Sequence, residues 1–298
     1  MRKMGTPTAA AVLALACIAS VAQAGEGGGS SYNGGVENFM AGAAPPPGFY
    51  VLEYGNVYHA SKLKDNAGND VPLPTFKVGA VAAATRFVWS TPTIIGGGNV
   101  IWHAIVPIVN LDVEVPGASQ NKTGLGDITF GPALSFHHSP NLHSVLALDF
   151  VAPVGSYRKN DLANIGRNYW SVQPLYTMSY LDKAGLNADF KLTFNFSRRN
   201  SDTDYRSGNE VYLDYSAGWG MGNGWVLGVG GYAMRQFSDD ESAGVSLPGS
   251  RGQAFAIGPS LKYDNGKGWF ITAKLQREMS VRNRPEGSAL WIKSTVPF

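Results

Sequence analysis

The chain has 298 residues, of which 15% are charged and 11% are aromatic, and its formal net charge is +2. An average soluble domain carries about 25% charged residues, so this composition argues against a soluble enzyme. The near-neutral charge argues against a nucleic-acid partner. No run of about 20 apolar residues follows the N-terminal region, which excludes a helical membrane protein.

Residues 1–24 have the pattern of a secretory signal peptide. Arg2 and Lys3 form a positive start, residues 9–22 form a short apolar stretch, and Ala22-Gln23-Ala24 fits the small-x-small cleavage rule. We therefore expect export and cleavage before Gly25. The apolar stretch is too short and too rich in alanine to favour a membrane-spanning helix.

The single cysteine, Cys17, lies inside this signal peptide. Ala14 stands where a lipoprotein signal would have leucine, which argues against a lipid anchor. After cleavage the chain has no cysteine, although it is exported to a compartment that permits disulfides. That argues against a small secreted fold stapled by disulfides.

Residues 25–48 are rich in Gly, Ala and Pro, and Pro45-Pro46-Pro47 cannot join a sheet ladder. One interpretation is a flexible periplasmic leader. The other is a segment folded into the lumen of the barrel that follows, as a partial plug in which Val36 to Ala44 form a short helix.

Residues 49–298 alternate between apolar and polar side chains in many short stretches. In the clearest stretch, 186–197, one face carries Leu186, Ala188, Phe190, Leu192, Phe194 and Phe196, and the other carries Asn187, Asp189, Lys191, Thr193, Asn195 and Ser197. This period of two predicts strands with an apolar face toward lipid and a polar face toward a lumen. The approximate spans are 49–60, 76–90, 99–111, 125–137, 142–154, 168–181, 185–199, 209–220, 224–237, 252–264, 267–282 and 288–298.

These stretches number about twelve, and transmembrane barrels have an even number of strands. The sequence thus predicts an all-β fold, a transmembrane antiparallel up-and-down β-barrel in the outer membrane. Short periplasmic turns and longer outer loops are the rule for such barrels. The predicted connections alternate in this way, with both termini on the periplasmic side: short at 138–141, 182–185, 221–224 and 264–267, and long at 61–75, 112–124, 155–167, 200–208 and 238–251.

The last stretch ends in an aromatic residue, Phe298, on its apolar face. A final strand with a C-terminal Phe resembles the signal that the barrel assembly machinery reads. We therefore expect Phe298 to be an assembly signal, with that machinery and outer-membrane lipid as partners.

Parity along the strands predicts which charged residues line the lumen. The signs nearly cancel, whereas a strongly selective ion pore shows a ring of one sign. One interpretation is that the charges pair with one another and conduct nothing. The other is a polar-walled path for neutral or weakly charged small molecules. The predicted lumen-lining residues are Glu53, Arg86, Asp127, Asp149, Asp189, Lys191, Asp214, Lys262, Lys274, Glu278 and Lys293.

We expect no enzyme activity, no cofactor and no metal. A barrel lipase or deacylase needs a Ser and a His together on the outer surface, whereas parity turns Ser135 and His137 toward the lumen. His137-His138, without a cysteine, is not a metal-ligand spacing. Gly96-Gly97-Gly98 precedes a strand rather than a helix, so it is not a phosphate loop.

Six motifs resemble the family called MetA-pathway of phenol degradation, or SphA-like outer-membrane proteins, over nearly the whole chain after the signal peptide. They are Pro46-Pro47-Gly48-Phe49-Tyr50, Gly124-Leu125-Gly126-Asp127-Ile128, Ala152-Pro153-Val154-Gly155-Ser156-Tyr157, Asn164-Ile165-Gly166-Arg167-Asn168-Tyr169-Trp170, Asp204-Tyr205-Arg206-Ser207-Gly208 and Gln236-Phe237-Ser238-Asp239-Asp240. Val154 departs from the pattern, which has a small hydroxyl residue there.

The resemblance implies an outer-membrane channel that helps small hydrophobic or aromatic compounds cross, and it brings no catalytic residue. The alternative function is a structural or adhesive barrel whose loops bind a partner and whose lumen is not open.

Overall fold

The computed structural model describes residues 25–296, so the predicted signal peptide and Phe298 lie outside the described residues. The assembly signal therefore stays a prediction.

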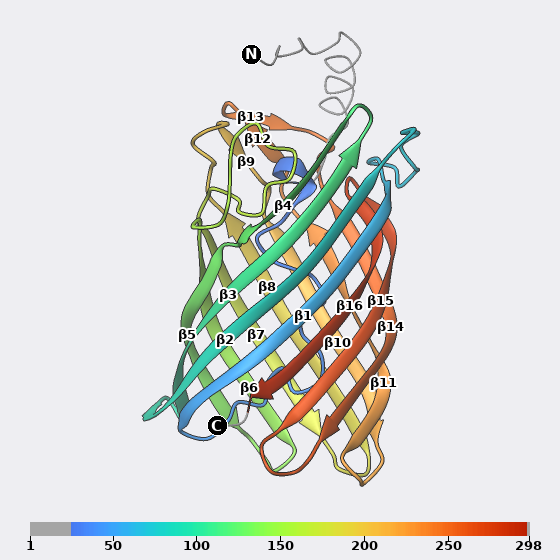
Figure 1. Cartoon of the computed structure of the whole chain (residues 1–298). Helices are drawn as coiled ribbons and strands as arrows, with labels where there is room; N and C mark the ends of the chain where they lie inside the picture. The colour runs from blue at the N-terminus through green and yellow to red at the C-terminus, as the bar shows by residue number, and fades with distance from the viewer. Residues whose placement is uncertain (1–24, 297–298) are drawn as a thin grey trace, which may run out of the picture.

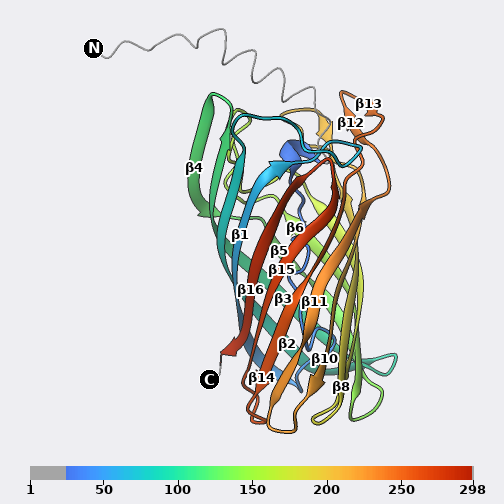
Figure 2. The same cartoon turned by 90° about the vertical axis from the view of Figure 1, so that its right-hand side faces the viewer.

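One antiparallel sheet of thirteen strands forms the body, and all of them except β4 close into a barrel of twelve (Figures 1 and 2). Each strand pairs with its neighbours along the chain, and β1 pairs with the last strand, Val51 lying opposite Val296. The predicted up-and-down barrel is thus confirmed. The barrel strands are β1 (Gly48–Leu63), β2 (Lys77–Ile95), β3 (Gly98–Val115), β5 (Ile128–His137), β6 (Leu142–Ala152), β7 (Ser171–Leu181), β8 (Leu186–Ser197), β10 (Glu210–Gly220), β11 (Trp225–Gln236), β14 (Gln253–Asp264), β15 (Phe270–Arg282) and β16 (Pro285–Val296).

The remaining strand, β4 (Ala118–Leu125), extends the barrel wall upward as a hairpin with the end of β3. The prediction of a loop over residues 112–124 is wrong. Ser119, Asn121 and Thr123 are exposed on one face, while Gln120 and Lys122 on the other bind Ala163 and Asp161 of the neighbouring loop. Polar residues can form such a strand because the ladder itself needs only backbone groups. Below the hairpin the chain passes through Gly126, whose N–H donates to Pro107 O at 2.9 Å, and β5 then pairs with the first half of β3.

Two other predicted loops also contain regular structure. β9 (Tyr205–Arg206), β12 (Asp240–Ser242) and β13 (Val245–Leu247) form a small three-stranded sheet at the loop end of the barrel (Figure 1). The short turns lie at the opposite end, where β1 begins and β16 ends.

The outer surface of the barrel is apolar and carries aromatic residues near the strand ends. Trp219 and Trp225 flank one short turn, and Trp89 lies opposite Trp102 near another. Trp170 is exposed at the loop end of β7. Aromatic girdles around an apolar band mark the lipid-facing surface of a membrane barrel.

Residues 25–47 run through the interior from the loop end down to the start of β1 (Figures 1 and 2). A single turn of 3-10 helix, η1 (Glu26–Gly28), stands at the loop end. The start of β1 and the end of β16 lie at the short-turn end, as expected. Gly25 lies at the opposite end, because residues 25–47 span the lumen. We call residues 25–47 the N-terminal segment.

The helix predicted for Val36 to Ala44 is absent from the described segment. The segment instead fits the wall through glycines. Gly35 has φ 81°, a left-handed conformation, and a Cβ on Gly42 would lie 2.9 Å from Met178 Cα on β7. The side chains around a regular helix would hold its backbone too far from the wall for such close approach.

Candidate functional site

The N-terminal segment is held by polar groups of the barrel wall. Asp214 on β10 accepts hydrogen bonds from the N–H groups of Gly35 (2.8 Å) and Glu37 (3.1 Å). Asp189 on β8 accepts from the N–H of Ala41 at 3.0 Å. Wall carboxylates therefore satisfy backbone groups that a helix would otherwise pair, so the irregular segment can be buried.

An ion network ties the middle of the segment to the wall. Lys293 Nζ on β16 lies 2.9 Å from a Glu37 carboxylate oxygen and also donates to Phe39 O at 3.1 Å. Arg86 on β2 approaches the same carboxylate at 3.4 Å, and Lys274 donates to Glu37 O at 2.6 Å. Because these groups are largely buried, removal of one partner would leave an uncompensated charge.

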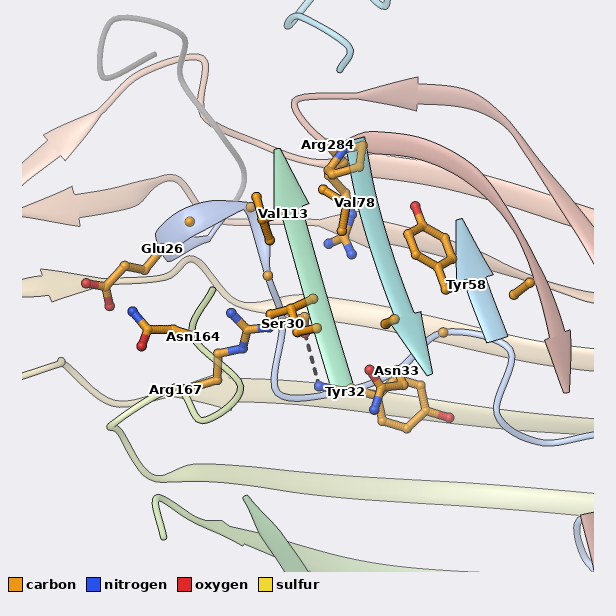
Figure 3. Close-up of a pocket in the computed structure, with 18 of the residues that line it drawn as sticks. Glu26, Ser30, Tyr32, Asn33, Tyr58, Val78, Val113, Asn164, Arg167 and Arg284 are labelled. Carbon is orange, nitrogen blue, oxygen red and sulfur yellow. Dashed lines mark hydrogen bonds between the residues drawn. The ribbon is translucent and has the colours of Figure 1, made fainter. Parts of the chain in front are cut away.

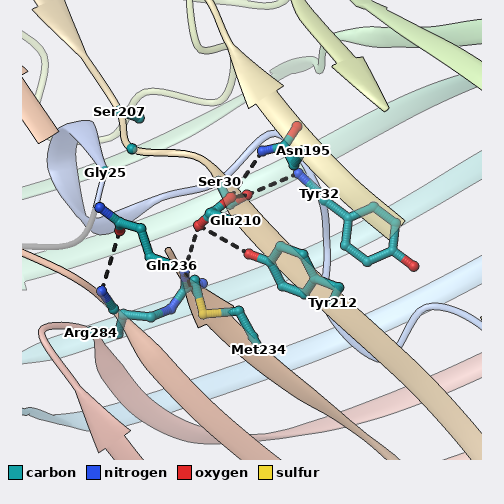
Figure 4. A network of polar contacts seen from close by, with 12 residues as sticks. Gly25, Ser30, Tyr32, Asn195, Ser207, Glu210, Tyr212, Met234, Gln236 and Arg284 are labelled. Atoms are coloured by element: carbon teal, nitrogen blue, oxygen red, sulfur yellow. Dashed lines mark hydrogen bonds and ion pairs between the residues drawn. The ribbon is translucent and has the colours of Figure 1, made fainter. Parts of the chain in front are cut away.

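A second set of contacts fixes the segment at the loop end (Figure 4). Ser30 Oγ donates to Glu210, which also accepts from Asn195 at 2.9 Å and pairs with Arg284 at 3.3 Å. The N–H of Gly25 donates to Asp240 of the small outer sheet at 2.9 Å.

Burial raises the pKa of the Asp240 carboxyl group, although Tyr205, Gly208 and Gly25 donate hydrogen bonds to it. The predicted cleavage before Gly25 would place the new α-ammonium group against this carboxylate. Such a pair would anchor the segment by charge as well as by hydrogen bonds.

Ten of the eleven predicted lumen charges lie on the inner side of the wall, in contact with the segment, with one another or with the lumen cavities. They are Arg86, Asp127, Asp149, Asp189, Lys191, Asp214, Lys262, Lys274, Glu278 and Lys293. Several of them form hydrogen bonds with other residues of the wall. Asp149 is 2.8 Å from His103 Nε2, and Glu278 accepts from Tyr58 OH at 2.9 Å and Gly287 N–H at 2.7 Å.

The prediction for Glu53 is wrong, because this residue lies on the outer face. It is exposed, and Thr85 on β2 donates a hydrogen bond to it at 2.9 Å. The neighbouring residues Tyr54 and Arg86 are the ones that face the segment. The parity of β1 is misleading because its inner face carries tyrosines, whose rings look like lipid-facing residues in the sequence.

The sequence also missed an apolar surface inside the lumen. The part of the inner faces of β2 and β3 that lines the inner cavity described below carries small and branched apolar side chains, with no charged residue among them. We call this set the apolar strip: Ala80, Ala82, Ala84, Ile105, Pro107, Val109 and Leu111. Residues 78–84 and 104–109 are apolar on both faces. A continuous apolar stretch gives no alternation from which to identify an inner face.

Two cavities lie between the apolar strip and the N-terminal segment. The mouth cavity, of about 510 Å³, opens at the loop end and is lined by Glu26, Tyr32, Val113 and Arg167 among others (Figure 3). The inner cavity, of about 240 Å³, lies below it along the strip. Both are lined by Tyr32, Ala80, Leu111, Arg167 and Trp291, so they adjoin.

Below the inner cavity the lumen is filled by a buried apolar cluster. Val88, Ile101, Ala133, Ala147 and Leu175 come from the wall, and Ala44 of the segment packs against them with Tyr50 and Leu52. The described lumen is therefore hollow toward the loop end and packed with apolar side chains toward the short turns.

Residues 25–296 contain no helix that is long and apolar enough to span a membrane. Within the same residues, no three His, Cys, Asp or Glu side chains gather in a way that could hold a metal ion.

The chain matches the model of the family described as putative MetA-pathway of phenol degradation over residues 60–293. The chain belongs to this family. The resemblance seen in the six sequence motifs is thus confirmed. Comparison with curated proteins gives no match.

Among solved structures, the COG4313 outer membrane channel from Pseudomonas putida F1 is similar to the family member described here. It is 16% identical, the match covers 88% of this chain and 100% of that chain, and the TM-score is 0.78. The fold is therefore that of an outer-membrane β-barrel, with the short turns, the start of β1 and the end of β16 on the periplasmic side.

Two further barrels are more distant. The translocator domain of the autotransporter NalP from Neisseria meningitidis is 10% identical over 86% of this chain and 91% of that chain, with a TM-score of 0.49. The CymD monoaromatic hydrocarbon channel is 9% identical over 85% of this chain and 89% of that chain, with a TM-score of 0.44. The Pseudomonas protein, whose whole length is matched, is described as a channel.

Proposed function

We propose that this protein lets small apolar or aromatic molecules cross the outer membrane, and that the N-terminal segment is a partial plug in its lumen. The observation that carries the proposal is the apolar strip, which lines two adjoining cavities beside the segment. An apolar solute that enters from the loop end would exchange water for this surface, which is favourable in proportion to the apolar area buried.

The wall charges support the same proposal. Those that contact the segment are used to hold it, as in the pairing of Glu37 with Lys293 and of Asp214 with backbone N–H groups. They therefore form no ring of one sign of the kind that ion-selective pores use. The family description, phenol degradation, and the channel identity of the Pseudomonas protein agree with passage of aromatic compounds.

Passage to the periplasm would cross the buried apolar cluster around Ala44. An apolar solute can replace side-chain contacts there without leaving a buried polar group unpaired. The step requires Ala44 and its neighbours in the segment to move aside, so the plug would act as a gate at the short-turn end.

Replacing Ala82 with Trp tests this path, because Ala82 lines the inner cavity on the apolar strip. The larger side chain should fill the cavity and reduce entry of labelled toluene into cells that lack the native protein. The matched control is Ala83→Trp, since Ala83 is the next residue of β2 and faces outward. Equal toluene entry with both variants would contradict the path along the strip. No entry with the unmodified protein would favour the structural or adhesive barrel.

A further inference from the structure

The lumen cavities contain cationic groups whose hydrogen-bonding capacity is unused. Lys191 on β8 lies opposite Asp214 in the sheet, yet its ammonium group makes no hydrogen bond or ion pair with any residue in 25–296. It stands 5.1 Å from the centre of the Tyr32 ring and lines the inner cavity. A free ammonium donor is thus directed at the space beside the apolar strip.

Arg167 provides a second such group at the boundary between the cavities. Its backbone N–H donates to Asp127 at 2.7 Å, but its guanidinium pairs with no carboxylate in the described part of the chain. The guanidinium lies against Gly29 of the segment, where a Cβ would come within 2.0 Å of Nη1. Arg167 lines both cavities, and Figure 3 shows it near Ser30 and Asn164.

Trp291 on β16 adds a neutral donor. Its indole Nε1 is buried and has no hydrogen-bond partner among the described residues, and the side chain lines both cavities. An indole N–H group can only donate, so a ligand with an acceptor atom would satisfy Nε1 of Trp291.

The carboxylates of the inner cavity are already bound. Glu37 is paired with Lys293, Asp149 accepts from His103, and Asp127 accepts from two backbone N–H groups. Among the charged groups that line the inner cavity, the two whose charged ends have no hydrogen bond or ion pair within residues 25–296 are therefore the cationic donors of Arg167 and Lys191. A molecule that fits must offer acceptor oxygens to these donors and an apolar body to the strip.

From this arrangement we propose that the passage selects aromatic acids: the ring lies on the apolar strip, and the carboxylate is bound first at Arg167 and then at Lys191. The inference rests on the proposed passage of aromatic molecules and narrows it to one chemical class. A carboxylate is favoured over a neutral hydroxyl because it adds the attraction between opposite charges to the hydrogen bond with a cationic donor. Arg167 presents a planar fork that suits a carboxylate, whereas Lys191 acts as a point charge deeper in the lumen.

Binding of benzoate and of benzyl alcohol to the folded, detergent-solubilised protein tests the proposal, since the two share a ring and differ in charge. Benzoate should bind more tightly, and Lys191→Met should weaken benzoate binding about tenfold while leaving benzyl alcohol unchanged. The control is Lys267→Met, which removes the same charge from an exposed short turn.

A loss of both ligands in Lys191→Met would show a structural role for Lys191 and overturn the proposal. So would an unchanged benzoate affinity, or equal binding of the two ligands to the unmodified protein. If benzyl alcohol binds and toluene enters cells while benzoate is not preferred, the selectivity fails and the passage of aromatic molecules stands. If neither ligand binds and toluene does not enter, both proposals fail.

Discussion

Removal of residues 25–44, with residues 1–24 kept for export, is expected to raise the ion conductance of the protein in planar bilayers several-fold. The deleted residues fill the lumen and include Glu37, which is paired with Lys293. Without them the inner wall would carry hydrated charges, including Asp189, Asp214 and Lys274. A barrel of this size holds water when side chains and plugs do not fill it.

Folding of the truncated barrel must be shown separately, because wall charges would lose their partners. Heat-modifiable mobility in gels serves as that control. A folded truncated barrel with the conductance of the intact protein would contradict the plug.

Replacing Leu192 with Arg is expected to destabilise the folded barrel by about 2–4 kcal/mol if the site lies near the middle of the membrane. Leu192 lies in the middle of β8 on the outer face, between Tyr176 and Leu213 of the adjacent strands. An arginine there would face lipid, where its charge has no partner. The measurement is unfolding by denaturant in lipid bilayers.

Lys191→Arg is the matched control, since Lys191 is the adjacent residue and lines the inner cavity. It should leave the free energy of unfolding nearly unchanged because it keeps a charge on the lumen side. Equal tolerance of arginine at both positions would show that the register of β8 is misassigned.

The alternating strands can be predicted closely from the sequence. The alternation predicts a strand over residues 185–199, and β8 covers Leu186–Ser197. Such strands have one face in lipid and one in a polar lumen, so the polarity of each side chain indicates which face it is on. The same logic places ten of the lumen charges correctly and misplaces Glu53, where inward tyrosines reverse the pattern.

The proposed path between the apolar strip and the N-terminal segment cannot be predicted from alternation. Around the apolar strip, residues 78–84 of β2 and 104–109 of β3 are apolar on both faces, so no alternation there separates the inner face from the outer one. The sequence leaves the course of the N-terminal segment open between a leader and a plug, because its docking depends on distant partners. Gly35 meets Asp214, and Ala41 meets Asp189, across separations that no local pattern encodes.

Reversible closure of the inner cavity would test the central claim most directly, because it compares one folded protein with itself. Cys17 is the only cysteine of the chain and lies in the predicted signal peptide, so Ala82→Cys would introduce a single thiol on the apolar strip. Modification of that thiol with a benzyl methanethiosulfonate should stop toluene entry into cells, and reduction should restore it, whereas the same treatment of Ala83→Cys should change nothing. Toluene entry that persists in the Ala82→Cys variant after full modification of its thiol would contradict a path between the N-terminal segment and the apolar strip.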